Sequence, residues 1–126
     1  MDSDIRGKAS EAHSRAHLLE NGYVTSTPDA DCKYDLVVDY NGDLLKVQVK
    51  RGYADGSRDD TLRVNMYDQN QNGVPNDAYE EDDVDAFIVH DPINVRLYWL
   101  WFDECPSSEI RRKYSSLSKH LIGKKL

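Results

Sequence analysis

The chain has 126 residues and a formal net charge of -7. Its length is typical of a single domain, residues 1–126, that buries one hydrophobic core without metal or disulfide cross-links. The N-terminus is charged from Asp2 onward and no apolar run approaches the roughly 20 residues of a membrane-spanning helix, so we expect a cytoplasmic protein with no membrane partner. The acidic balance argues against a uniformly basic, nucleic-acid-binding surface.

The charge is unevenly distributed along the chain. From Ile110 to the end there are six basic residues and no acid, whereas Asp77–Asp91 contains seven acids and no Lys or Arg. Residues 107–126 are therefore predicted to form a basic C-terminal helix or tail, which either contacts DNA or is a solvated helix face. Asp outnumbers Glu by 17 to 6, a surface composition that indicates a halophile, because abundant salt screens the repulsion.

The first predicted element is a helix that begins after Ser3 as N-cap and ends at Asn21-Gly22. Its apolar residues recur at spacings of three and four, which places them on one stripe. These residues are Ile5, Ala9, Ala12, Ala16 and Leu19.

A β-hairpin follows a short predicted strand at Tyr23–Ser26. The runs Tyr34–Tyr40 and Asp43–Lys50 are rich in β-forming residues and are separated by Asn41-Gly42. Asn-Gly favours a two-residue type I′ turn, because both positions require positive φ angles.

The rest of the chain is predicted to contain three further strands and a helix. Gly52–Asp60 is expected to be a charged loop, and 68–77 a polar connection. The strands are Leu62–Tyr67, Val84–His90 and Val95–Phe102, the last two joined by a turn at Asp91–Asn94, and the helical face consists of Ile110, Tyr114, Leu117 and Leu121.

The register of the hairpin brings polar groups together. A two-residue turn places Asp35 opposite Gln48, with Lys50 on the same face and Val47 and Val49 toward the core. A carboxylate, an amide oxygen and the main-chain carbonyl of Val49 are suitable oxygen ligands for Mg²⁺. The alternative is a solvated sheet face whose polar residues serve solubility alone.

The pattern resembles the PD-(D/E)XK nuclease superfamily. Asp35 is followed after twelve residues by Gln48-Val49-Lys50, and Gly7–Glu11 lies on the preceding helix. The similarity runs from about Gly7 through Asp103 and is to small members such as archaeal Holliday junction resolvases and intron homing endonucleases. It implies an α/β, restriction-endonuclease-like fold: a mixed sheet with flanking helices and the hairpin at its centre.

The same resemblance implies a metal-dependent DNA endonuclease that uses Mg²⁺, with Mn²⁺ as a substitute. The implied catalytic residues are Glu11, Asp35, Gln48 and Lys50, and the implied metal ligands are Asp35, Gln48, Val49 and Glu11. Tyr34 stands where the motif has proline, and Gln48 stands where it has an acid. Because Gln48 lacks a charge, the alternative is a catalytically inactive module of the same fold that binds DNA or protein.

DNA, branched or duplex, is the expected partner. Its candidate contacts are Lys8, Arg15, Arg51, Arg111, Arg112 and Lys113. One subunit carries one site and two strands need two cuts, so we expect a twofold homodimer. Two simpler interpretations remain: Glu11 pairs with Arg15 one helical turn away, or the chain is a structural domain from a halophile whose motif is accidental.

Overall fold

The computed structural model describes residues 2–67, 79–105 and 108–123, so the predicted polar connection at 68–77 lies outside the described residues, as do Lys124 and Lys125. The helical elements are α1 (Ser3–Glu20), α2 (Tyr114–Leu117), and the 3₁₀ turns η1 (Phe102–Glu104) and η2 (Ser118–His120). The strands are β1 (Thr25–Ser26), β2 (Leu36–Tyr40), β3 (Asp43–Arg51), β4 (Tyr53–Asp55), β5 (Arg58–Asn65), β6 (Ala86–Asp91), β7 (Arg96–Trp101) and β8 (Glu109–Lys113). No helix in these ranges is long and apolar enough to cross a bilayer.

The larger sheet is mixed, as predicted, and β3 lies at its centre in the order β1-β2-β3-β6-β7. Only β3 and β6 run parallel; the other neighbours are antiparallel. The predicted hairpin is confirmed, because Tyr40 pairs with Asp43 and the turn residues Asn41 and Gly42 have φ angles of 52° and 95°. These angles are the left-handed conformations that a type I′ turn requires.

A second sheet, β4-β5-β8, corrects two predictions. The expected loop Gly52–Asp60 contains β4 and the start of β5, and the expected C-terminal helix begins only at Tyr114, because Glu109–Lys113 forms β8 against β5. β4 pairs with the neighbouring β5 as a hairpin, whereas β8 satisfies its backbone groups by pairing with β5 from a distant part of the chain, which local periodicity does not reveal. The alternation of buried Leu62, Val64 and Met66 is as predicted.

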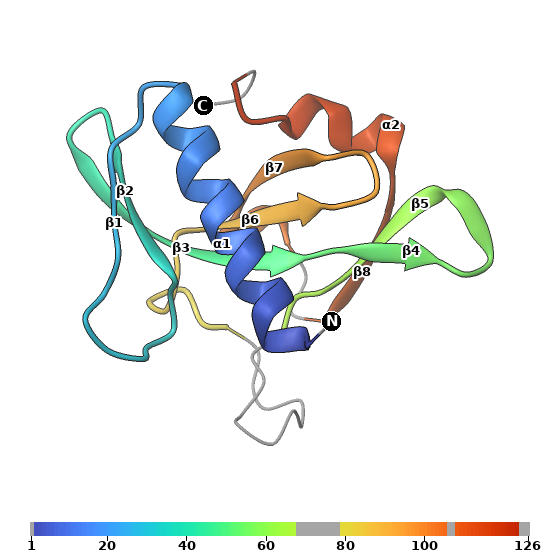
Figure 1. Ribbon diagram of the computed structural model, residues 1–126, viewed down its shortest axis with the longest axis horizontal. Helices are drawn as coiled ribbons and strands as arrows, with labels where there is room; N and C mark the ends of the chain where they lie inside the picture. The colour runs from blue at the N-terminus through green and yellow to red at the C-terminus, as the bar shows by residue number, and fades with distance from the viewer. Residues whose placement is uncertain (1, 68–78, 106–107, 124–126) are drawn as a thin grey trace.

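The larger sheet is covered on both faces. One hydrophobic cluster includes Leu18 of α1 with Val47, Val49 and Trp99, and the other includes Leu62 and Val64 of the small sheet with side chains of β6 and β7. Figure 1 shows α1 lying across the sheet, with the β4–β5 hairpin extending to one side. The cleft described below opens where these layers meet.

The packing face of α1 is not the predicted apolar stripe. Ile5 and Leu19 are each 57% exposed, whereas Ser10, Ser14 and Leu18 are buried against the sheet. The serines are accommodated because Ser14 Oγ donates to the Ser10 carbonyl at 2.8 Å and Ser10 Oγ lies 2.7 Å from Nδ1 of His90. A buried hydroxyl costs little free energy once it is hydrogen-bonded.

The ends of α1 are capped by local side chains. Asp2, not Ser3, is the N-cap, and its carboxylate accepts a hydrogen bond from the Asp4 amide at 2.8 Å. The helix ends at Asn21-Gly22 as predicted, and Gly22 has a φ angle of 88°. The fixed helix places its first three turns beside the start of β2 and the end of β3.

Candidate active site

The predicted catalytic residues line one cleft of about 620 Å³. It opens between α1, the end of β3 and the small sheet. Its lining includes Glu11, Asp35, Gln48, Val49, Lys50 and Arg51. The fold thus brings together residues from the helix, the chain before β2, and β3.

Asp35 lies one residue before β2, and here the predicted register needs correction. The ladder between β2 and β3 ends at the pair Leu36–Val47, so Asp35 does not form a ladder pair with Gln48. Instead the Asp35 amide donates to the Val47 carbonyl at 2.9 Å, and its Oδ2 accepts from the Val49 amide at 2.9 Å. Asp35 is therefore fixed to β3 by two hydrogen bonds, one through its main-chain amide and one through its carboxylate.

Gln48 points away from the α1 side of the sheet, toward the cleft. It alternates with Val47 and Val49, which are buried in the cluster beneath α1. Its Oε1 atom is buried and has no hydrogen-bond partner among the described residues. A solvated sheet face does not explain this environment, because a polar atom placed there for solubility would be exposed to water.

Lys50 is held on one side of the cleft by two tyrosines that the motif does not contain. Its Nζ donates to the Tyr67 carbonyl at 3.0 Å and to the Tyr79 hydroxyl at 3.1 Å, and lies 4.8 Å from the centroid of the Tyr79 ring. Sequence reasoning missed both tyrosines, since no spacing relates them to Lys50. These contacts direct the ammonium group into the cleft lining.

The carboxylates of Asp35 and Glu11 both lie in surroundings that disfavour their charged forms. Burial raises the pKa of Asp35, against the lowering effects of the Val49 hydrogen bond and the Lys50 charge. Burial and then the Asp35 charge raise the pKa of Glu11. Glu11 forms an ion pair of 3.6 Å with Lys8, rather than the pair with Arg15 that was the simpler alternative interpretation.

This donor set fits a hard divalent cation. Such ions prefer oxygen ligands, and the cleft offers the carboxylates of Glu11 and Asp35 and the amide oxygen of Gln48, which lacks a partner within the described residues. A cluster of three or more His, Cys, Asp or Glu side chains suited to a metal is not found in the described ranges.

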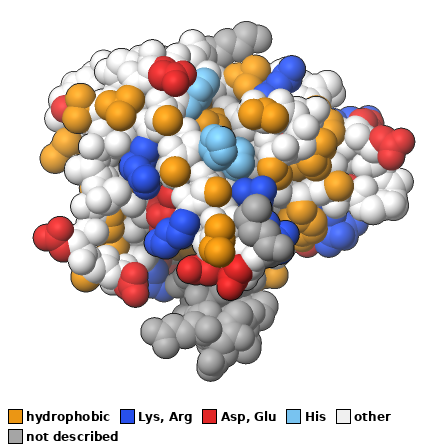
Figure 2. All heavy atoms as spheres, in the orientation of Figure 1, with side chains coloured by type: hydrophobic (Ala, Val, Ile, Leu, Met, Phe, Trp, Pro, Cys, Tyr) orange, Lys and Arg blue, Asp and Glu red, His pale blue; other side chains and the backbone are white. Residues whose placement is uncertain are grey.

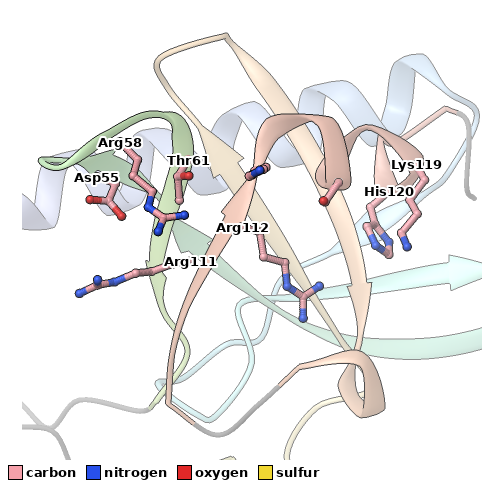
Figure 3. A pocket seen from close by; sticks show the side chains of 9 residues that line it. Asp55, Arg58, Thr61, Arg111, Arg112, Lys119 and His120 are labelled. Atoms are coloured by element: carbon pink, nitrogen blue, oxygen red, sulfur yellow. The ribbon is translucent and has the colours of Figure 1, made fainter.

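The predicted DNA-contacting residues fall into two groups. Arg51 lines the cleft, and Lys8 and Arg15 line an adjoining cavity of about 470 Å³ that also includes Glu11 and Asp35. The others, Arg111, Arg112 and Lys113, lie on β8 and line a separate cavity, shown in part in Figure 3. Figure 2 shows basic and acidic side chains interspersed over the face that carries α1, so this face has no continuous basic surface.

The comparisons with known proteins agree with this geometry. The profile of the PD-(D/E)XK endonuclease family matches residues 1–120. The fold is similar to that of a bacterial homing endonuclease, I-Ssp6803I, with a TM-score of 0.74 and 24% sequence identity over 89% of this chain and 78% of that chain. No curated protein matches the chain. The predicted restriction-endonuclease-like fold is confirmed, and the chain belongs to the PD-(D/E)XK endonuclease family.

Proposed function

We propose that this protein is a metal-dependent endonuclease that hydrolyses phosphodiester bonds of DNA in the cleft between α1 and β3. The observation that carries the proposal is the buried Gln48 Oε1, which has no partner among the described residues and lines the same cleft as Asp35 and Glu11. An unsatisfied buried oxygen costs roughly 1–3 kcal/mol, which a bound cation would recover.

The proposed ligands are Asp35, Gln48, the main-chain carbonyl of Val49, and Glu11. When bound, Mg²⁺ or Mn²⁺ supplies Lewis-acid polarisation of the scissile phosphate and activation of water. Asp35 supplies negative charge from a position fixed by the Val49 amide. Glu11, which α1 contributes to the cleft, serves as a further oxygen ligand or holds the attacking water.

Lys50 is the proposed electrostatic catalyst. Its ammonium is positioned by the Tyr67 carbonyl and the Tyr79 hydroxyl, at 3.0 and 3.1 Å, so little reorganisation is needed when charge develops on the phosphate. It orients the attacking water or stabilises the negative charge of the transition state. Tyr79 is a positioning residue in this scheme, because it acts through Lys50.

The proposed substrate is DNA, duplex or branched, contacted near the cleft by Lys8, Arg15 and Arg51. Homing-type cleavage is one specific possibility, because the similar solved structure is a homing endonuclease; resolvase-like cleavage of branched DNA is another. Cutting two strands requires two such clefts, which a twofold homodimer would supply. A panel of junction, flap, single-stranded and duplex DNA, with mass measurement of the protein in solution, decides among these assemblies and substrates.

The test of the activity compares Lys50→Ala with Lys46→Ala, a lysine on the same strand that does not line the cleft. We expect Mg²⁺-dependent cleavage by the wild type, a loss of about 100-fold or more for Lys50→Ala, and little change for Lys46→Ala. DNA affinity and melting temperature of Lys50→Ala should stay near wild type.

The presence of Gln48 in place of an acid favours one alternative, a module of the same fold that binds DNA or protein without cleaving. DNA binding without cleavage in Mg²⁺ or Mn²⁺ would establish that alternative. Equal cleavage by Lys50→Ala and wild type would instead remove Lys50 from the mechanism.

A further inference from the structure

A second cavity, of about 630 Å³, lies between the β4–β5 hairpin, β8 and the segment after α2. Figure 3 shows Arg58 and Arg111 at one end and Lys119 at the other, with Arg112 between them. Five basic side chains line it: Arg58, Arg111, Arg112, Lys113 and Lys119. The lining contains one carboxylate, Asp55, among the described residues. Such a concentration of positive charge is unexpected in a chain of net charge -7.

Three of these cations lack an ion-pair partner within the part of the chain that the structure describes. Arg58, Lys113 and Lys119 are exposed and form no ion pair with any residue in the described ranges. Asp55 forms no ion pair with them in the described ranges, and its Oδ1 accepts hydrogen bonds from the amide and hydroxyl of Ser57 at 2.9 and 2.8 Å. Like charges held close together repel, so an anion in this cavity would lower the free energy.

Arg111 and Arg112 are each held by a hydrogen bond within the protein before any ligand binds. Arg111 Nε donates to Glu109 at 3.0 Å, and one terminal nitrogen of Arg112 donates to the Glu104 carbonyl at 2.8 Å. A guanidinium has five N–H donors, so each arginine retains several for a phosphate. Fixing the side chains in advance reduces the entropy lost on binding.

The small sheet connects this cavity to the cleavage cleft. Across β5 and β8, Thr61 pairs with Lys113 and Asn65 pairs with Glu109. Thr61 lines the basic cavity and Asn65 lines the cleft. Thr61 and Asn65 are four positions apart, so their side chains lie on the same face of the sheet, about 13 Å apart along the strand. That distance corresponds to about four base pairs of duplex DNA.

We infer that the basic cavity binds backbone phosphates of the same DNA substrate, about four base pairs from the point where β5 reaches the cleft. The inference rests on the proposed function, because it assigns part of the same substrate to a second site. Phosphate contacts of this kind fix the position and direction of a duplex without reading its sequence. The cavity therefore extends the DNA-binding surface from α1 to the far end of the small sheet.

The experiment measures DNA affinity against salt concentration with a chelator present, so that the DNA stays intact. It compares the double variant Arg58→Gln/Lys113→Gln with the double variant Lys46→Gln/Arg96→Gln, which removes the same charge outside both cavities. On a duplex of about 30 base pairs, the first variant should lower the slope of log affinity against log salt by about two, roughly one per residue. The control should keep the wild-type slope.

A length series tests the spacing. On duplexes too short to reach both cavities, the Arg58→Gln/Lys113→Gln variant should bind with the wild-type slope, and its deficit should appear as the DNA lengthens. An unchanged slope on long DNA, or saturation by inorganic phosphate with no dependence on DNA length, overturns the inference. Cleavage in Mg²⁺ is measured separately. If the wild type cleaves DNA but the variant keeps the wild-type slope, only the proposed phosphate-binding cavity is rejected. If the variant lowers the slope but the wild type does not cleave DNA, only the proposed nuclease activity is rejected.

Discussion

The carboxylate of Asp35 accepts a 2.9 Å hydrogen bond from the Val49 amide, and this contact ties the start of β2 to the strand that carries Gln48 and Lys50. Among the described residues only Oδ2 accepts a hydrogen bond, which leaves Oδ1 facing a ligand in the cleft. The backbone of β3 thus sets the position of the Asp35 carboxylate. A substitution can therefore remove its negative charge and still keep the hydrogen bond from Val49.

Asp35→Asn should therefore separate structure from catalysis. The asparagine oxygen can still accept from Val49, so the free energy of unfolding should change by less than about 1 kcal/mol. The negative charge is lost, so metal affinity should fall and cleavage should decrease by about 100-fold or more. Calorimetric titration with Mn²⁺ and a cleavage assay check this. Wild-type cleavage by Asp35→Asn, with the fold intact, would exclude Asp35 as a ligand.

Two glycines near the cleft should respond to alanine in opposite ways. A Cβ atom on Gly52 would lie 2.8 Å from side-chain atoms of Leu62, which is fully buried, so Gly52→Ala should destabilise the fold by about 1–3 kcal/mol. A Cβ atom on Gly7, inside α1, would meet no atom within 4 Å. Gly7→Ala should stabilise by about 0.5–1 kcal/mol, because alanine loses less backbone entropy in a helix.

Urea unfolding of both glycine variants measures these changes. Equal stabilities for Gly52→Ala and wild type would mean that Leu62 moves aside without loss of packing. A destabilised Gly7→Ala would indicate that this turn of α1 is less regular than its hydrogen bonding suggests.

The sequence predicted the parts of the fold that depend on local chemistry. Asn41-Gly42 determines the type I′ turn by itself, so the central hairpin and the placement of Gln48 and Lys50 were accessible. The packing face of α1 was not predictable, because Ser10 is buried in contact with His90, which lies 80 residues away in the chain. β8 was likewise missed because its partner β5 is distant, and the spacing of Ile110 and Tyr114 imitates a helix.

The site was predicted to the extent that it follows the motif. Asp35, Gln48 and Lys50 line one cleft with Glu11 as expected. The contacts that Tyr67 and Tyr79 make to Lys50 were not predictable, because they arise from segments that tertiary packing brings together. Predicted roles for all four motif residues stay predictions until cleavage is measured.

The buried His90 should make stability depend on pH. Burial, followed by the charges of His13 and Arg51, lowers its pKa to about 4 from 6.5, with Asp91 opposing the shift. Between pH 4 and pH 6.5 the unfolded state binds a proton at His90 that the folded state does not. The contribution of His90 to the free energy of unfolding is therefore complete above pH 6.5 and is lost as pH falls toward 4. We expect a loss of about 2–3 kcal/mol from this group.

The measurement is the free energy of unfolding from pH 7.5 to 4 for wild type, His90→Gln and His17→Gln. His90→Gln should show a shallower decline than wild type over this range, although it is less stable at pH 7.5 through loss of the Ser10 contact. His17→Gln, which changes a histidine of α1 instead, should retain the wild-type decline. A His90→Gln profile parallel to wild type would mean that His90 is not the source of the effect.

Gln48→Glu provides the sharpest test of the metal site. A carboxylate at this position adds a negative charge beside Asp35, so a divalent ion should bind more tightly and cleavage should be kept or increased. Without metal, the same two carboxylates repel each other, so the variant should melt at a lower temperature than wild type near neutral pH. At a Mg²⁺ concentration of about 100 times the dissociation constant, binding should restore roughly 2.7 kcal/mol of stability. Thermal melting with and without Mg²⁺, with Asn41→Asp as a matched change of charge at the exposed hairpin turn outside the cleft lining, separates site binding from general screening. If Mg²⁺ raises the melting temperature of Gln48→Glu no more than that of the control, the cleft is not a magnesium site and the non-cleaving DNA-binding or protein-binding module becomes the better description.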